Sequence, residues 1–187
     1  MGKAEKTTEA ILNAAQALIL ESDGDAQRVT IRQVADRAEV SVGLVNYYFS
    51  SKTKLIEACV QRMIGSVVST FQPILPEQTT RQERLGRVAS QVADYLEQHE
   101  EISRISILGD CNSPTLNDNT FGTMRGFCYT IDGGEMSTEA LQRAFCLTAV
   151  LQSVFLRKDI LKDSIGVDWN EKQQRDDFLK HVCEWIL

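Results

Sequence analysis

The sequence predicts an all-α protein, and three observations carry this prediction. Apolar residues recur every three or four positions along most of the 187 residues, which is helical spacing. Short polar residues suited to capping precede several of these stretches. No stretch shows the alternation of apolar and polar residues that is typical of a strand. We therefore expect a small N-terminal module, residues 1–51, followed by a larger helical domain, residues 52–187.

The first two expected helices have clear starts. Thr7 or Thr8 can cap the first helix, whose apolar stripe consists of Ile11, Ala14, Ala15 and Leu18. The polar run at 22–25 ends it. Thr30 can cap the second helix, because Gln33 three residues later completes a capping box.

The third expected helix follows a tight turn at Glu39 and Val40, with Ser41 as its cap. Its inner face consists of Val45, Tyr48 and Phe49, and its outer face of Val42, Gly43, Asn46 and Tyr47. Such a small or polar face can enter a DNA major groove. The segment is therefore interpreted as a helix-turn-helix; the alternative is an ordinary helical hairpin whose aromatic residues only fill a core.

The rest of the chain is expected to be helical as well. A long helix at 52–71 should bury Leu55, Ile56, Cys59, Met63 and Val67, and Pro73 and Pro76 should stop it. This long helix leaves the N-terminal module and enters the larger domain, so we expect it to transmit conformational changes between the two. Gly133 and Gly134 mark a break, and Ser137 can cap the helix after it. The further expected helices are 80–99, 102–108, 115–131, 137–159 and 170–187, with an irregular loop at 110–114.

One stretch of the sequence resembles a known family. Thr30-Ile31-Arg32-x-Val34-Ala35, then Val40-Ser41-x-Gly43-x-Val45, then Tyr47-Tyr48-Phe49-x-Ser51-Lys52-x-x-Leu55 is similar to the DNA-binding domain of the TetR (tetracycline-repressor) family. The similarity covers about residues 8 to 60. It implies an N-terminal three-helix helix-turn-helix DNA-binding domain joined to a helical ligand-binding and dimerisation domain.

The resemblance also implies roles for individual residues. The helix from Ser41 would read bases, while Tyr47, Tyr48 and Lys52 would contact phosphates, which fix register without reading sequence. The chain departs from the family pattern at Val42, Leu44 and Asn46. Asn46 either pairs with adenine or is a solvated helix residue. The expected DNA-binding residues are Thr30, Arg32, Ser41, Val42, Gly43, Asn46, Tyr47, Tyr48 and Lys52.

The charge is divided along the chain. The net charge is −6, yet the segment from Arg28 to Lys54 holds five basic and two acidic residues. From Leu55 onward there are 13 basic and 19 acidic residues. The basic segment is a candidate DNA-binding surface, and the acidic remainder of the chain would limit nonspecific binding to DNA.

The last two expected helices carry apolar residues on more than one face, which indicates burial on both sides. The resemblance implies that they pair with their mates in a homodimer, as a palindromic operator would require. The alternative is a monomer in which both are internal core helices. The expected dimer residues are Leu141, Phe145, Phe178, Val182 and Trp185.

The middle helices would hold a small-molecule effector, since they combine aromatic area with a few polar groups. The alternative for each residue, and the more frequent role of such residues, is a place in the core or at the surface. The candidates are Tyr95, Phe121, Met124, Arg125, Cys128, Gln152 and Phe155.

The resemblance implies a repressor that releases its operator when an effector binds, and the protein is expected to be cytoplasmic, with no cofactor, no metal site and no membrane segment. The alternative is a DNA-binding activator, or a regulator that senses a partner protein or thiol oxidation, for which only Cys128 has a cationic neighbour, Arg125. An enzyme is not expected: His181 and Cys183 stand two apart on a helix and cannot form a nucleophile–base pair.

Overall fold

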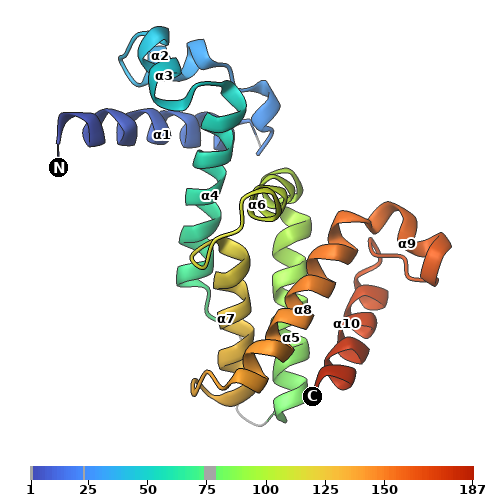
Figure 1. Cartoon of the computed structure of the whole chain (residues 1–187). Coiled ribbons are helices and arrows are strands. Elements are labelled where there is room, and N and C mark those ends of the chain that lie inside the picture. The colour runs from blue at the N-terminus through green and yellow to red at the C-terminus, as the bar shows by residue number, and fades with distance from the viewer. Residues whose placement is uncertain (1, 23, 74–78) are drawn as a thin grey trace. The chain divides into compact units, whose positions relative to one another are not determined.

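The computed structural model describes residues 2–22, 24–73 and 79–187, and these residues contain helices and no strand (Figure 1). The elements in chain order are α1 (Lys3–Glu21), the 3-10 turn η1 (Ala26–Arg28), α2 (Ile31–Arg37), α3 (Val42–Phe49), α4 (Lys52–Thr70), α5 (Arg81–Gln98), α6 (Glu100–Asn112), α7 (Asn119–Asp132), α8 (Thr138–Leu156), α9 (Lys158–Ile165) and α10 (Lys172–Ile186). The all-α prediction is confirmed.

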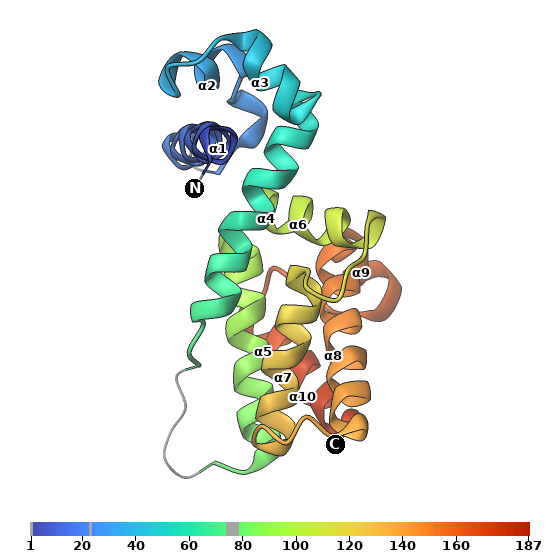
Figure 2. The ribbon, with the colours of Figure 1, turned by 60° about the vertical axis from the view of Figure 1, so that its left-hand side comes forward.

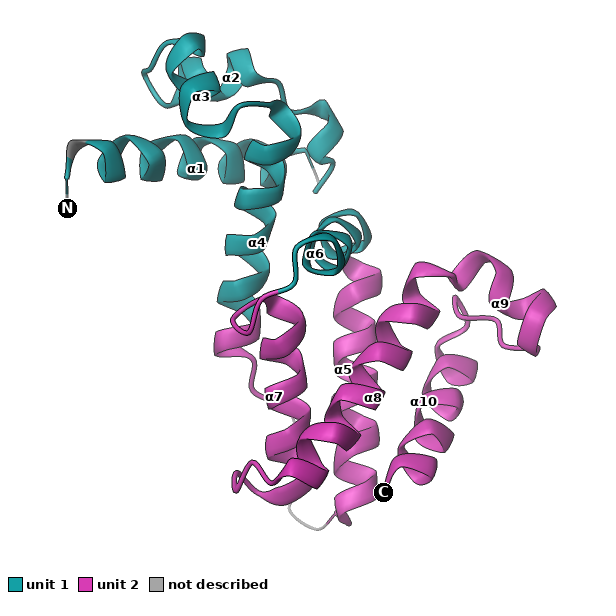
Figure 3. Cartoon of the chain, viewed as in Figure 1, with its two compact units in different colours: residues 1–67, 99–114 teal, residues 68–98, 115–187 magenta. Residues whose placement is uncertain are grey.

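The helices form two compact units (Figure 3). Unit 1 consists of residues 1–67 and 99–114, and unit 2 of residues 68–98 and 115–187. Helix α6 therefore belongs with α1 to α4, although its sequence neighbours α5 and α7 belong to unit 2. The functional boundary between residues 51 and 52 stays a prediction, because a compact unit and a functional domain need not coincide.

Unit 1 is built around the small buried faces of its first helices. Ile11, Ala15 and Ile19 of α1 are inaccessible to solvent, as are Val34 of α2 and Val45 of α3. Burial of these branched and small side chains fixes α2 and α3 against α1. The same unit buries Leu55, Cys59 and Val60 of α4.

Unit 2 contains the larger apolar core. Helices α5, α7, α8 and α10 lie side by side in both views (Figures 1 and 2). They share one cluster of buried side chains that includes Leu85, Phe127, Leu147, Leu151, Trp169 and Leu179. Such a cluster supplies most of the free energy that holds a helical unit together.

Several helix boundaries differ from the predictions. Helix α1 begins at Lys3 rather than near Thr8, because the Glu5 carboxylate accepts the backbone N–H of Gly2 at 2.6 Å and caps the helix earlier. The Thr8 hydroxyl instead donates to the carbonyl of Ala4 at 3.1 Å. On α4, Met63 and Val67 are only half-buried. Pro76 lies outside the described residues.

The largest differences lie in the second half of the chain. The expected loop at 110–114 is helical as far as Asn112, and α7 begins only at Asn119, where Asp118 caps it by accepting the N–H of Phe121 at 2.9 Å. The expected helix 137–159 is two helices, because Arg157 leaves helical geometry at φ −115° and α9 begins beyond it.

No helix in the described part of the chain combines the length and the apolar character needed to cross a membrane.

Candidate nucleic-acid interface

Helix α2 begins with the capping box that the sequence predicts. The backbone N–H of Thr30 donates to Gln33 Oε1 at 2.9 Å, and the backbone N–H of Gln33 donates to Thr30 Oγ1 at 3.3 Å. This reciprocal pair satisfies two amides that the first helical turn leaves free. It fixes the start of α2, which exposes Arg32 one residue into the helix.

The turn between α2 and α3 is tight. The backbone N–H of Val40 donates to the carbonyl of Ala35 at 3.0 Å, and Glu39 between them adopts φ +54°. Ser41 then caps α3, accepting the N–H of Leu44 on its hydroxyl at 3.1 Å. These bonds define the angle at which α3 leaves the turn.

The outer face of α3 is the surface that the sequence predicts for base reading. Val42, Gly43, Asn46 and Tyr47 are exposed, and Tyr47 is 80% accessible, whereas Val45 is fully buried. The Tyr47 and Tyr48 rings meet edge to face, with centroids 5.3 Å apart. This contact holds the Tyr47 ring at the edge of the outer face, and Tyr48 is half-buried behind it.

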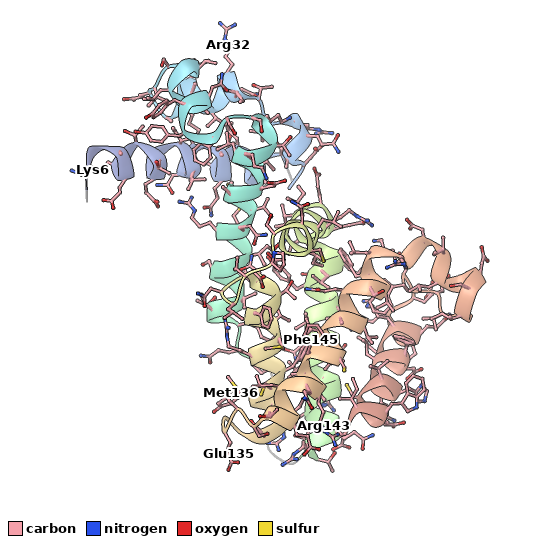
Figure 4. The ribbon with its side chains drawn as sticks, viewed as in Figure 1. Lys6, Arg32, Glu135, Met136, Arg143 and Phe145 are labelled. Carbon is pink, nitrogen blue, oxygen red and sulfur yellow. The ribbon has the colours of Figure 1, made fainter. Side chains whose placement is uncertain are left out.

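The basic residues of the segment are not all available to a partner. Arg28 pairs with Asp25 at 2.9 Å, Arg37 with Glu21 at 2.7 Å, and Lys54 with Glu57 at 2.8 Å. Arg32 forms no ion pair within the described ranges, and its side chain projects outward from α2 (Figure 4). Arg32 is thus the basic side chain of the helix-turn-helix best placed to meet a phosphate.

Lys52 has a structural contact that the sequence did not suggest. Its ammonium group donates to the backbone carbonyl of Gln27 in η1 at 2.7 Å. This bond ties the start of α4 to the turn that precedes α2. The same ammonium remains half-exposed, so a phosphate contact by Lys52 stays a prediction.

Comparison with known proteins agrees with this geometry. Residues 11–59 match the family described as "Bacterial regulatory proteins, tetR family". This segment of the chain is therefore a TetR-type N-terminal domain. The match includes all of α2 and α3 and most of α1, so that its helix-turn-helix is a DNA-binding one.

Solved structures of TetR-family proteins share the fold over the whole chain. A TetR transcriptional regulator from Rhodococcus sp. RHA1 is 19% identical with a TM-score of 0.58, covering 100% of this chain and 98% of its own. A tetR-family regulator from Streptomyces coelicolor is 20% identical with a TM-score of 0.61, covering 100% of this chain and 82% of its own. A search of curated proteins gives no match.

The predicted effector residues all lie in unit 2. Phe155, Cys128 and Met124 are buried, while Tyr95 and Phe121 are half-buried. Gln152 donates to the Thr120 hydroxyl at 2.9 Å, and Arg125 donates to the Leu116 carbonyl at 3.0 Å. Their polar groups therefore already have protein partners, and an effector role for any of the seven residues remains a prediction.

Cys128 does not have the properties of a redox sensor. It is fully buried, and burial, together with the nearby Asp132 carboxylate, raises the pKa of its thiol. Burial also raises the pKa of Cys59 to about 11 and that of Cys183 to about 12. The thiolate is the reactive form, so these three cysteines are held in their unreactive state.

The predicted dimer residues fall into two groups. Phe145 on α8 is 52% exposed and Trp185 on α10 is 76% exposed, whereas Leu141 and Phe178 are half-buried. Val182 is 3% exposed and belongs to the core of its own unit, so a role for it in a dimer interface remains a prediction.

Sequence reasoning missed the residues that connect helices across long sequence separations. Gln61 of α4 donates from Nε2 to Asp110 of α6 at 2.8 Å and to the carbonyl of Ser106 at 3.1 Å. Glu101, at the start of α6, receives the backbone N–H groups of Ala26 and Gln27 in η1. Helix α6 is therefore tied both to α4 and to the turn before α2.

Proposed function

We propose that this chain is a homodimeric repressor that binds a palindromic operator through α2 and α3 and releases it when a small molecule binds unit 2. The observation that carries the DNA-binding part is the exposed outer face of α3, with Asn46 and Tyr47 on it and Arg32 beside it on α2. A face of this composition admits base edges without a bulky apolar obstruction.

The residues of the interface divide into two roles. Tyr47 and Arg32 donate to phosphates and set the register of the protein on the duplex. Asn46 lies one residue from Tyr47 on the exposed face, where its amide can pair with an adenine. Lys52 holds η1 through the Gln27 carbonyl and adds positive charge at the same edge.

The experiment that tests DNA binding measures affinity for duplexes of different sequence as a function of salt. Arg32→Ala should weaken binding to all duplexes and make the salt slope shallower by about one unit. Asn46→Ala should instead relax preference at one base pair of each half-site, at a cost of about 1–3 kcal/mol. The matched control is Arg157→Ala, which removes an exposed arginine from unit 2. Equal affinities for the wild type and the Arg32 and Asn46 variants would refute the assignment.

The dimer part of the proposal is supported by the outer face of α8. Phe145, Cys146 and Ala149 are exposed there within about one turn of each other, and an exposed apolar row of this kind is typical of an interface. Phe145→Glu should give a monomer in sedimentation and lower operator affinity, because a charge buried in an interface is costly. Leu116→Glu, at a loop residue that is 76% exposed, is the control. A wild-type chain that sediments as a monomer at micromolar concentration would contradict the proposal.

The release mechanism is a population shift between a DNA-competent and a DNA-incompetent state. The chain passes between the two units within α4 and on either side of α6, so both helices are available to carry the signal. A screen of small apolar molecules for release of labelled operator identifies the effector, and calorimetry then measures its affinity with and without operator. Reciprocity requires a difference, typically about 1–3 kcal/mol. Equal affinities would exclude the mechanism.

A further inference from the structure

We propose that Glu39 sets the DNA affinity of the helix-turn-helix, because its carboxylate repels the phosphate backbone and weakens sequence-independent binding. This inference rests on the proposed role of α3 as the DNA-reading helix. It assigns a function to the turn between α2 and α3, whose residues carry none in the proposal above.

The backbone at Glu39 shows that a glutamate is not the residue that this turn favours. Ala38 ends α2, Glu39 adopts φ +54°, and the N–H groups of Glu39 and Val40 donate to the carbonyls of Asp36 and Ala35 at 3.3 and 3.0 Å. This is the helix ending in which glycine or asparagine is preferred after the cap. A side chain with a Cβ is strained in the left-handed region. The position thus carries a backbone strain that glycine would remove.

The side chain of Glu39 is exposed, and it forms no ion pair in the parts of the chain that the structure describes. Arg28 and Arg37, on the same segment of the chain, pair with Asp25 and Glu21 instead. The charge of Glu39 is therefore neither neutralised nor used to hold the turn.

Glu39 lies next to the N-terminal end of α3, where its negative charge can act on bound DNA. Glu39 precedes the α3 cap, Ser41, by two residues, so their Cα atoms are at most about 7.6 Å apart. The N-terminal end of a recognition helix is the part that meets the groove. Surface charges act on each other over about one Debye length, about 8 Å at physiological salt, so a carboxylate beside this end of α3 repels phosphates that bind there. Its repulsion opposes the attraction of Arg32.

The test is the affinity for a labelled random-sequence duplex of about 30 base pairs at low salt, since this binding is almost wholly electrostatic. Glu39→Gln removes the charge and keeps the strain, and it should bind about threefold to tenfold more tightly than the wild type. The gain should shrink as salt is raised. Glu39→Asp keeps the charge and should match the wild type.

Two further variants separate charge from other effects. Glu135→Gln makes the same charge change at an exposed turn residue of unit 2, labelled in Figure 4, and should leave affinity unchanged. Glu39→Gly removes charge and strain together, so it should show the gain of Glu39→Gln and also raise Tm by about 2–4 °C. Circular dichroism confirms that each variant is folded.

The outcomes are distinct. If Glu39→Gln binds the duplex no more tightly than the wild type, or if only Glu39→Gly gains affinity, the charge is not the determinant and the inference is overturned. If the folded wild type binds no duplex at any salt concentration, the proposed DNA-binding function fails as well.

Discussion

Unit 1 and unit 2 are held together by different kinds of contact. In unit 1, directional polar bonds join helices that lie far apart in sequence. Arg62 of α4 donates from Nη1 to Glu9 at 2.9 Å, and from Nη2 to Asn13 and Gln16 at 2.9 Å each, all three on α1. These groups are partly exposed, so each bond contributes only about 1 kcal/mol.

In unit 2 the corresponding polar groups are buried around an aromatic side chain. Trp169 is fully buried and donates from its ring N–H to Glu97 Oε1 at 2.9 Å. Lys158 donates to Glu97 Oε2 at 2.9 Å, and Arg175 donates to the Trp169 carbonyl at 2.7 Å. Removal of any one partner leaves buried polar groups unpaired, which is costly.

The difference shows how one chain can combine a stable frame with a helix-turn-helix that can be repositioned. A large apolar core with buried ion pairs opens rarely, whereas a smaller unit tied by half-exposed bonds opens at lower free energy. We therefore expect unit 1 to exchange its amide hydrogens faster than the core of unit 2.

The largest effect should come from Trp169. Trp169→Ala should lower the free energy of unfolding by about 3–5 kcal/mol, because it empties the centre of the unit 2 core. Urea denaturation followed by circular dichroism measures the loss. Leu116→Ala is the control, since Leu116 is 76% exposed, and it should stay within about 0.5 kcal/mol of the wild type.

Trp169→Phe separates packing from hydrogen bonding at the same position. It keeps an aromatic ring but removes the donor to Glu97, so we expect a loss of about 1–3 kcal/mol. A loss equal to that of Trp169→Ala would mean that the hydrogen bond, and not the ring, dominates. No loss for either variant would contradict the picture of unit 2 as the stable frame.

A smaller and more local effect is expected at Gln61 in unit 1. Gln61→Leu removes the donor at 2.8 Å from the buried carboxylate of Asp110 and should cost about 1–3 kcal/mol. Hydrogen exchange should show faster exchange in α6, while the Leu147 and Leu151 amides of α8 keep their protection. Gln98→Leu, at an exposed residue, is the control. Uniform acceleration across both units would mean that they unfold as one.

The contrast also explains what the sequence could and could not reveal. The starts of α2, α3 and α8 were predicted correctly because a capping side chain bonds to an amide only a few residues away, as Ser137 does to Ala140 at 3.3 Å. Such local signals are legible in the order of residues. The outer face of α3 followed from helical spacing in the same way.

The parts that could not be predicted depend on partners distant in sequence. Glu97 and Trp169 are 72 positions apart, and Gln61 and Asp110 are 49 apart. Periodicity carries no information on such pairs, so the helical extension of α6 past Leu108 and the break at Arg157 were missed.

The smallest predicted effect is a pH dependence of opposite sign in the two units, and it concerns Glu101 and Asp94. In unit 1, burial raises the pKa of Glu101, as does the neighbouring Asp25, and together they outweigh the N–H groups of Gln27 and Ala26. In unit 2, burial alone would raise the pKa of Asp94, but hydrogen bonds from Lys172 and Arg175 lower it.

These shifts predict opposite stability changes on acidification. The folded protein binds the Glu101 proton more tightly than the unfolded chain, so the contribution of Glu101 to stability grows as pH falls into the ordinary glutamate range. The contribution of Asp94 is present above the ordinary aspartate pKa and is lost as pH falls below it. Between about pH 7 and pH 4, Glu101→Gln should therefore lose stability relative to the wild type, whereas Asp94→Asn should gain on the wild type only as the pH falls below about 4. Urea denaturation at a series of pH values measures both differences, and slopes of the same sign would show that the two carboxylates do not sit in opposite electrostatic environments.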